Sequence, residues 1–164
     1  MAYLSDTSVI LRLNEPSNPI SKVVEECLDK LSQAGEELVI VPQVLVEFWV
    51  VATRPKNVNG LGFTTDEAEK VLDNLQKLFT VLPENAQIFD EWKTLVVKHE
   101  VRGKPTHDAR IAAAMIVHEI ENILTLNPGD FKRFTEIKAI RPQDVWKNNQ
   151  IKRLIFTSKE TINE

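Results

Sequence analysis

The chain has 164 residues, a length that fits one domain with a single hydrophobic core. Hydrophobic residues make up 43% of it and charged residues 27%, and no apolar stretch is long enough to span a membrane. The formal net charge of −4 does not indicate nucleic-acid binding, for which a basic face is typical, although local basic groups allow a polyanionic substrate.

Short apolar runs alternate with helical periodicities along the chain. The predicted strands span residues 2–5, 38–41, 79–82, 122–126 and 137–140. The predicted helices span residues 7–13, 21–34, 44–53, 64–78, 85–99 and 108–119. Alternation of this kind predicts an α/β fold with three layers, in which helices cover both faces of a mostly parallel sheet of four to five strands. We expect residues 1–146 to form this domain and residues 147–164 to form a C-terminal extension of uncertain order.

The N-terminal residues carry no basic segment and meet Asp6 at once, unlike a signal peptide. Cys27 is the only cysteine, so the chain cannot form an internal disulfide. These features predict a cytoplasmic protein. Cys27 also shares helical spacing with Val24, Leu28 and Leu31, which predicts a small core residue and not a reactive thiol.

Four acidic residues lie where apolar runs give way to polar residues. They are Asp6, Glu47, Asp108 and Asp130. Ligands of open α/β sheets bind beyond the carboxyl ends of the strands, and Asp6 and Asp130 each follow a predicted strand. Carboxylates gathered in one pocket repel one another unless a cation holds them together. An all-oxygen site suits Mg²⁺ or Mn²⁺, so the pattern predicts a metal site assembled by folding.

Glu47 is the only charged residue in the apolar stretch 44–52. A buried carboxylate is costly unless it is paired or bound to a metal. The alternative to a metal is therefore an ion pair with Arg12 or Arg110. Trp49 and Val50, which we place on the opposite side of this helix, favour a subunit contact and hence a homodimer.

The other three acids also have simpler structural interpretations. Asp6 is suited to cap the helix that follows it. Asp108 lies in the first turn of its helix, where the helix dipole favours an anion. Residues 127–130 have the sequence Asn-Pro-Gly-Asp, which predicts a type II turn with Phe131 anchored in the core. The prediction of a metal site therefore rests on the four acids taken together and not on any one of them.

Other catalytic signatures are missing from the sequence. His99, His107 and His118 lack the spacing of a zinc site, although His107 adjoins Asp108 and could contact a substrate. The chain also has no glycine-rich phosphate loop and no Gly-x-Ser-x-Gly nucleophile turn.

Five motifs in a fixed order resemble the PIN-domain nucleases, and most closely their VapC-type toxin branch. The resemblance covers about residues 1–145, and its fourth motif is the most specific. The motifs are Asp6-Thr7-Ser8, Pro42 with Glu47, Phe79-Thr80-Val81-Leu82-Pro83, His107-Asp108-Ala109-Arg110-Ile111-Ala112-Ala113 and Thr125-Leu126-Asn127-Pro128-Gly129-Asp130-Phe131. Each motif is weak alone, but all five in order are a strong match.

The resemblance implies a PIN-like fold and a Mg²⁺- or Mn²⁺-dependent endoribonuclease that cleaves RNA. It also implies a cognate antitoxin protein as partner and a homodimer, with no association with a membrane. Two alternatives remain open: a PIN nuclease of RNA processing, and a non-catalytic RNA- or protein-binding module on the same fold. A receiver-like signalling domain is disfavoured because the predicted third strand does not end in an aspartate.

The resemblance also assigns roles to individual residues. Asp6, Glu47 and Asp108 would be the main metal ligands, and Asp130 would be the fourth acid, with Asn127 as a supporting group. Family members carry their fourth acid near either of those last two positions, and here only Asp130 is acidic. As a mechanistic hypothesis beyond the resemblance, the hydroxyl groups of Thr7 or Ser8, together with that of Thr125, would hold water bound to the metal. A basic group near the rim, with Arg110 and Lys132 as candidates, would position phosphates.

Overall fold

The computed structural model describes residues 1–146, so the extension predicted for residues 147–164 lies outside the described residues. One five-stranded sheet runs through the domain in the order β3-β2-β1-β4-β5. Its strands are β1 (Ala2–Ser5), β2 (Glu37–Ile40), β3 (Thr80–Val81), β4 (Asn122–Leu124) and β5 (Lys138–Ile140). All four strand pairs are parallel, which confirms the predicted fold class and places every carboxyl end at one edge of the sheet.

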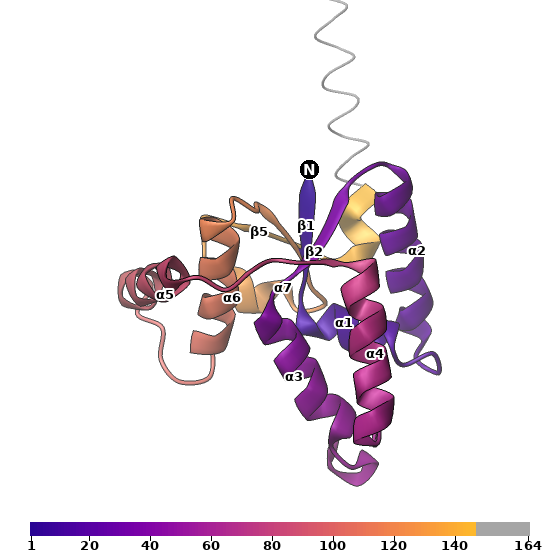
Figure 1. The fold of residues 1–164 in the computed structure, drawn as a ribbon. Coiled ribbons are helices and arrows are strands. Elements are labelled where there is room, and N and C mark those ends of the chain that lie inside the picture. The colour runs from indigo at the N-terminus through magenta and orange to yellow at the C-terminus, as the bar shows by residue number, and fades with distance from the viewer. Residues whose placement is uncertain (147–164) are drawn as a thin grey trace, which may run out of the picture.

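Helices cover the sheet, with α5 and α6 on one side and α2 and α4 on the other (Figure 1). The α-helices are α1 (Thr7–Leu13), α2 (Pro19–Gln33), α3 (Pro42–Thr53), α4 (Thr65–Leu78), α5 (Ala86–Lys98), α6 (Thr106–Val117) and α7 (Pro128–Phe131). Two short 3₁₀ helices, η1 (Lys56–Val58) and η2 (Pro142–Asp144), complete the described fold. Tyr3, Leu4 and Ser5 are all buried, as expected for a central strand that is covered on both faces.

Several helix starts differ from the predicted positions for a physical reason. Helices α2 and α3 begin two residues earlier than expected, at Pro19 and Pro42. Proline suits the first helical position because its fixed φ is already helical and its missing N–H needs no partner there. At α4, Thr64 and Glu67 form a complete capping box: the Thr64 hydroxyl accepts from the Glu67 backbone and the Glu67 carboxylate accepts from the Thr64 backbone.

The prediction of a type II turn at residues 127–130 is wrong. Such a turn needs a positive φ at its third residue, but Gly129 is not among the glycines with positive φ. The segment instead forms the single-turn helix α7, in which the Asp130 N–H donates to the Asn127 carbonyl at 3.0 Å. Phe131 is only 2% exposed, so the predicted core anchor is confirmed.

One contiguous hydrophobic core fills the space between sheet and helices. Its largest fully buried side chains include Phe48, Phe134, Leu4, Ile10 and Met115. Small side chains on α6 pack against the same core: Ala109, Ala112 and Ala113 are completely buried. None of the described helices has the length and apolar character that crossing a membrane requires.

Candidate metal centre

The carboxyl ends of the two central strands carry the first parts of the site. Asp6 follows β1 directly, and its N–H donates to the Leu124 carbonyl of neighbouring β4 at 2.9 Å. Thr125 follows β4 and lies at the same edge, because the two strands are parallel. Residues that lie 119 positions apart in the chain are therefore brought into contact.

Asp6 is held by hydrogen bonds on both carboxylate oxygens. Its Oδ1 accepts from the Thr7 N–H at 2.8 Å, and this bond also caps α1 as predicted. Its Oδ2 accepts from the Ser8 hydroxyl at 2.8 Å and from the Thr125 hydroxyl at 2.9 Å. Asp6 is 8% exposed, and this burial raises its pKa, although the three hydrogen bonds act in the opposite direction.

Glu47 is fixed by two neutral donors. The Thr7 hydroxyl donates to its Oε2 at 2.6 Å, and the Gln43 amide donates to its Oε1 at 2.8 Å. Among residues 1–146, Glu47 makes no ion pair with Arg12 or Arg110. These arginines pair instead with Glu15 and Glu84. The ion-pair interpretation of Glu47 is therefore wrong.

Asp108 and Asp130 lie close enough to interact electrostatically. Desolvation by burial is the main cause that raises the pKa of Asp108 to about 6, and the negative charges of Asp130, Asp6 and Glu47 raise it further. Asn127 is exposed, and its backbone N–H donates to the Thr125 hydroxyl at 3.1 Å. Asp130 therefore lies at the same pocket as Asp108, while Asn127 contacts Thr125 through its backbone.

A pocket of about 540 Å³ opens over these side chains. Glu47, Asp108 and Asp130 line it, and so does Thr7, whose N–H donates to the buried Asp6. His107 also lines the pocket, as its position beside Asp108 suggested. The four predicted acids and the predicted hydroxyl groups are thus brought to one place by folding.

The three hydroxyl groups act on the carboxylates themselves. The Thr7 hydroxyl donates to Glu47, and the Ser8 and Thr125 hydroxyls donate to Asp6. The sequence predicts that such groups hold water at a metal. Since each proton is directed at a carboxylate oxygen, their role in this structure is to fix the acids in place.

The donor set fits a hard divalent cation. None of the four acids forms an ion pair within the described part of the chain. Burial raises the pKa of Asp108 most, and the charges of the other three acids raise it further. No three acidic, histidine or cysteine side chains in residues 1–146 converge closely enough to enclose one ion. Mg²⁺ commonly keeps several waters and takes only one or two carboxylates from the protein, so an open acidic pocket suits it better than a closed cage.

Two predictions about the surroundings of the acids need correction. The basic residues that line the pocket are Arg54 and Lys104, and neither Arg110 nor Lys132 does so. Val50 also lines the pocket, on the same side of α3 as Glu47 and not on the opposite side. Residues three positions apart in a helix share a face, which is the spacing that should have placed Val50 correctly.

Sequence reasoning also missed Gln43. Its amide group donates to Glu47 and to the His107 carbonyl at 3.0 Å, and its carbonyl oxygen accepts from Arg110 at 3.3 Å. Gln43 therefore ties α3 to the start of α6 across the site. Its position four residues before Glu47, on the same helix face, was the available signal.

Known proteins share this architecture. The family model for the PIN domain matches residues 3–137. A protein of Rickettsia bellii (strain RML369-C) named Ribonuclease VapC is 29% identical over 143 residues, covering 85% of this chain and 96% of its own length. VapBC2 from Rickettsia felis, solved bound to a DNA fragment from its promoter, has a TM-score of 0.67 at 18% identity and covers 86% of this chain and 98% of its own. VapC20 from Mycobacterium tuberculosis, described as a sarcin-ricin loop cleaving toxin, has a TM-score of 0.60 at 18% identity. Its match covers 80% of this chain and 95% of its own length.

Proposed function

Because this chain belongs to the PIN-domain family, we propose that it is a divalent-metal-dependent endoribonuclease and the toxin of a toxin–antitoxin pair. One observation carries the proposal: three acids from distant segments line one pocket, and Thr7 links the fourth, Asp6, to this group. None of the four has an ion-pair partner among residues 1–146. The name of the Rickettsia bellii relative, which matches nearly its full length, favours a ribonuclease. The same name favours a toxin over a nuclease of RNA processing.

Asp6, Glu47, Asp108 and Asp130 would hold Mg²⁺ or Mn²⁺ in this pocket. When bound, such an ion supplies Lewis-acid chemistry: it acidifies water and offsets negative charge on the phosphodiester oxygens. The affinity for the ion comes from the carboxylates, whose mutual repulsion a divalent cation relieves.

The protein's own contribution is to fix these carboxylates before substrate arrives. Asp6 is held by Ser8 and Thr125, and Glu47 is held by Thr7 and Gln43. Neutral donors orient a carboxylate without cancelling its charge, as a metal ligand requires. The apolar side chains of Val50 and Val51 line the same pocket.

The proposal includes the partners and the compartment. RNA is the substrate, a cognate antitoxin protein is the inhibitor, and the active form is a homodimer in the cytoplasm. The side chain of Val46 on α3, which is 64% exposed and does not line the pocket, provides apolar surface that a protein partner or a second copy would cover.

The test is cleavage of a mixed pool of RNAs in the presence of Mn²⁺, with and without a chelator. We expect the wild type to cleave RNA with Mn²⁺ and to lose this activity on chelation. Asp6→Asn should be inactive, whereas Asp73→Asn, which changes an exposed acid of α4, should cleave like the wild type. Equal cleavage by the wild type and Asp6→Asn under chelation contradicts the mechanism. Mn²⁺ binding without cleavage of any RNA would identify a binding module instead.

A further inference from the structure

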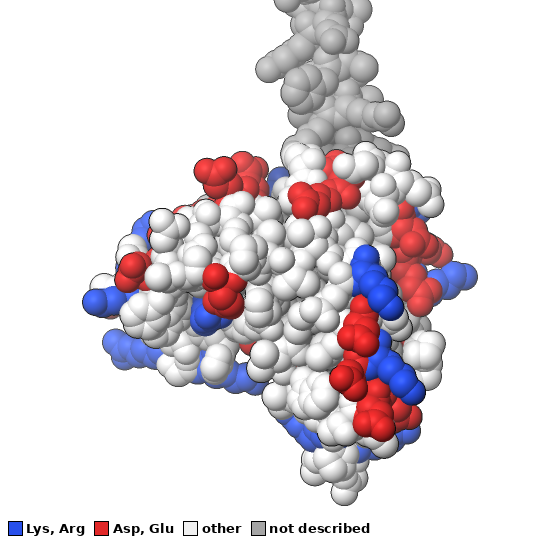
Figure 2. All heavy atoms as spheres, viewed as in Figure 1, with Lys and Arg blue, Asp and Glu red and all other residues white. Residues whose placement is uncertain are grey.

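The acidic pocket also carries two basic residues, Arg54 and Lys104, on its lining. They come from different elements: Arg54 is the C-cap residue directly after α3, and Lys104 lies in the turn before α6. Within the described residues neither forms an ion pair, so both cations are available to a ligand. Figure 2 shows blue atoms along the lower edge of this face, under α6 and under the lower end of α3.

The backbone of Arg54 is fixed by the loop that follows it. The Gly62 N–H donates to the Arg54 carbonyl at 2.9 Å, and the Leu61 N–H donates to the Val51 carbonyl at 3.0 Å. A Cβ on Gly60 would lie 1.8 Å from the Arg54 carbonyl oxygen, so only glycine allows the loop to pack this closely. The loop therefore closes the end of α3 and holds Arg54 at the pocket.

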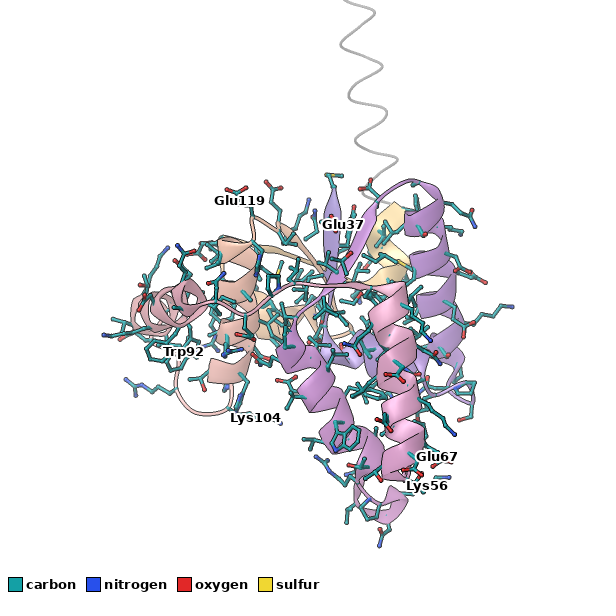
Figure 3. The ribbon with its side chains drawn as sticks, in the orientation of Figure 1. Glu37, Lys56, Glu67, Trp92, Lys104 and Glu119 are labelled. Carbon is teal, nitrogen blue, oxygen red and sulfur yellow. The ribbon has the colours of Figure 1, made fainter. Side chains whose placement is uncertain are left out.

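The turn that carries Lys104 is fixed in a comparable way. The Thr106 hydroxyl donates to the Gly103 carbonyl at 2.7 Å, and the Trp92 indole donates to the Thr106 carbonyl at 2.9 Å. The Gln43 amide, which also holds Glu47, donates to the His107 carbonyl. Figure 3 shows Lys104 at the base of α6, beside this turn, with Trp92 on the neighbouring α5.

These positions place positive charge on two separate elements that border the acids. Arg54 follows Glu47 by seven residues, which is about 10 Å along a helix axis. Lys104 lines the same pocket from the turn before α6. We propose that Arg54 and Lys104 form a phosphate cradle, in which each binds a backbone phosphate next to the one that is cleaved. This inference rests on the proposed nuclease function, because it assigns the residues that position its substrate.

Electrostatics gives the reason for such a cradle. The chain has a net charge of −4, and the cluster of acids repels an RNA strand that approaches the pocket. Two cations on the lining of the pocket offset this repulsion at the flanking phosphates while leaving the acids themselves unpaired. Contacts to the backbone position the strand and do not select its sequence, so the cradle should act on RNAs of any sequence.

The test measures binding of a fluorescently labelled single-stranded RNA by anisotropy, with EDTA present, over a series of KCl concentrations. Each phosphate contact adds about 0.7 to the slope of log affinity against log salt for a single strand. Arg54→Ala and Lys104→Ala should each lower the slope by about 0.7 and weaken binding at low salt by about fivefold. Lys132→Ala and Arg133→Ala remove exposed cations that do not line the pocket, and should leave the slope unchanged.

Gly60→Ala provides an independent variant, because it displaces Arg54 without changing any charge. Its effect should have the same direction as that of Arg54→Ala, and the double variant should bind no more weakly than Arg54→Ala alone. Wild-type slopes for both Arg54→Ala and Lys104→Ala would overturn the cradle. Cleavage assays with Mn²⁺ separate this outcome from failure of the proposed function: a protein that cuts RNA with unchanged slopes refutes only the cradle, and one with lowered slopes but no cleavage refutes only the nuclease.

Discussion

The Thr7 hydroxyl donates a 2.6 Å hydrogen bond to Glu47, while the Thr7 backbone N–H donates to Asp6 at 2.8 Å. One residue therefore connects two acids that lie on different elements, at the end of β1 and within α3. Thr7 is only 9% exposed, so its side chain has little freedom to turn away. Thr7 is therefore a direct link between the two carboxylates.

Thr7→Val should impair catalysis without unfolding the protein. Valine keeps the shape of the side chain but removes the donor to Glu47, whereas Thr7→Ser keeps the donor. Groups that orient metal ligands typically contribute about 10- to 100-fold to activity or metal affinity. We therefore expect RNA cleavage with Mn²⁺ to fall by about this factor in Thr7→Val and to be largely retained in Thr7→Ser. Comparable cleavage by the two variants, with comparable melting temperatures, would argue against the positioning role.

Asp108 should make the stability of the metal-free protein depend on pH. Its pKa rises from 3.8 to about 6 on folding, mainly through burial. The folded state therefore binds this proton more tightly than the unfolded state. The resulting stabilisation is complete below the unfolded pKa and is lost as pH rises through the folded pKa.

Asp108→Asn removes this titration and serves as the control. With EDTA present, the wild type should lose stability relative to Asp108→Asn as pH rises from about 4 to about 7. Thermal melts of both proteins at several pH values measure the difference. A difference in melting temperature that stays constant over this range would show that Asp108 does not titrate with a raised pKa.

The sequence predicted which acids gather at the site but not the hydrogen bonds and packing contacts that hold them there. Asp6 and Asp130 were located because acids that follow buried strands fall at one edge of a parallel sheet. The spacing of Gln43 and Glu47 on one helix face is a local signal for their contact, but the bond from Gln43 to the His107 carbonyl depends on α3 approaching the start of α6, a tertiary contact that no local pattern encodes. The Pro128-Gly129 pair suits a type II turn and the first turn of a helix equally well, and the burial of Phe131 favours the helix.

The same dependence on tertiary contacts explains why the sequence favoured Arg110 and Lys132 as the basic residues at the pocket. Arg110 lies two positions after Asp108 and was a natural candidate for binding phosphate. In the folded protein, its guanidinium group pairs with Glu84 at 2.8 Å. Arg54 reaches the pocket only because the loop around Gly60 packs against it. Packing of a loop against a distant helix end cannot be read from helical or strand periodicity.

Cys27 should be unreactive in the native protein. Its side chain is 3% exposed, and desolvation by burial raises the pKa of the thiol to about 11. The thiolate is the reactive form, so both access and ionisation are suppressed near neutral pH. Labelling by iodoacetamide should therefore be slow in buffer and fast in denaturant, with mass spectrometry as the readout. Rapid labelling of the folded protein would contradict the core assignment of Cys27.

Mn²⁺ should stabilise the folded protein through the four acids. A ligand that binds only the folded state at about 100 times its Kd contributes about 2.7 kcal/mol. For a protein of this size, that contribution corresponds to a rise in melting temperature of roughly 5–10 °C. Asp108→Asn and Glu47→Gln should show a much smaller rise, because each removes a charge from the pocket. Asp73→Asn, which alters an exposed acid of α4, should respond like the wild type. If the wild type, Asp108→Asn and Asp73→Asn all shift equally with Mn²⁺, the ion binds elsewhere on the surface and these carboxylates are not its ligands.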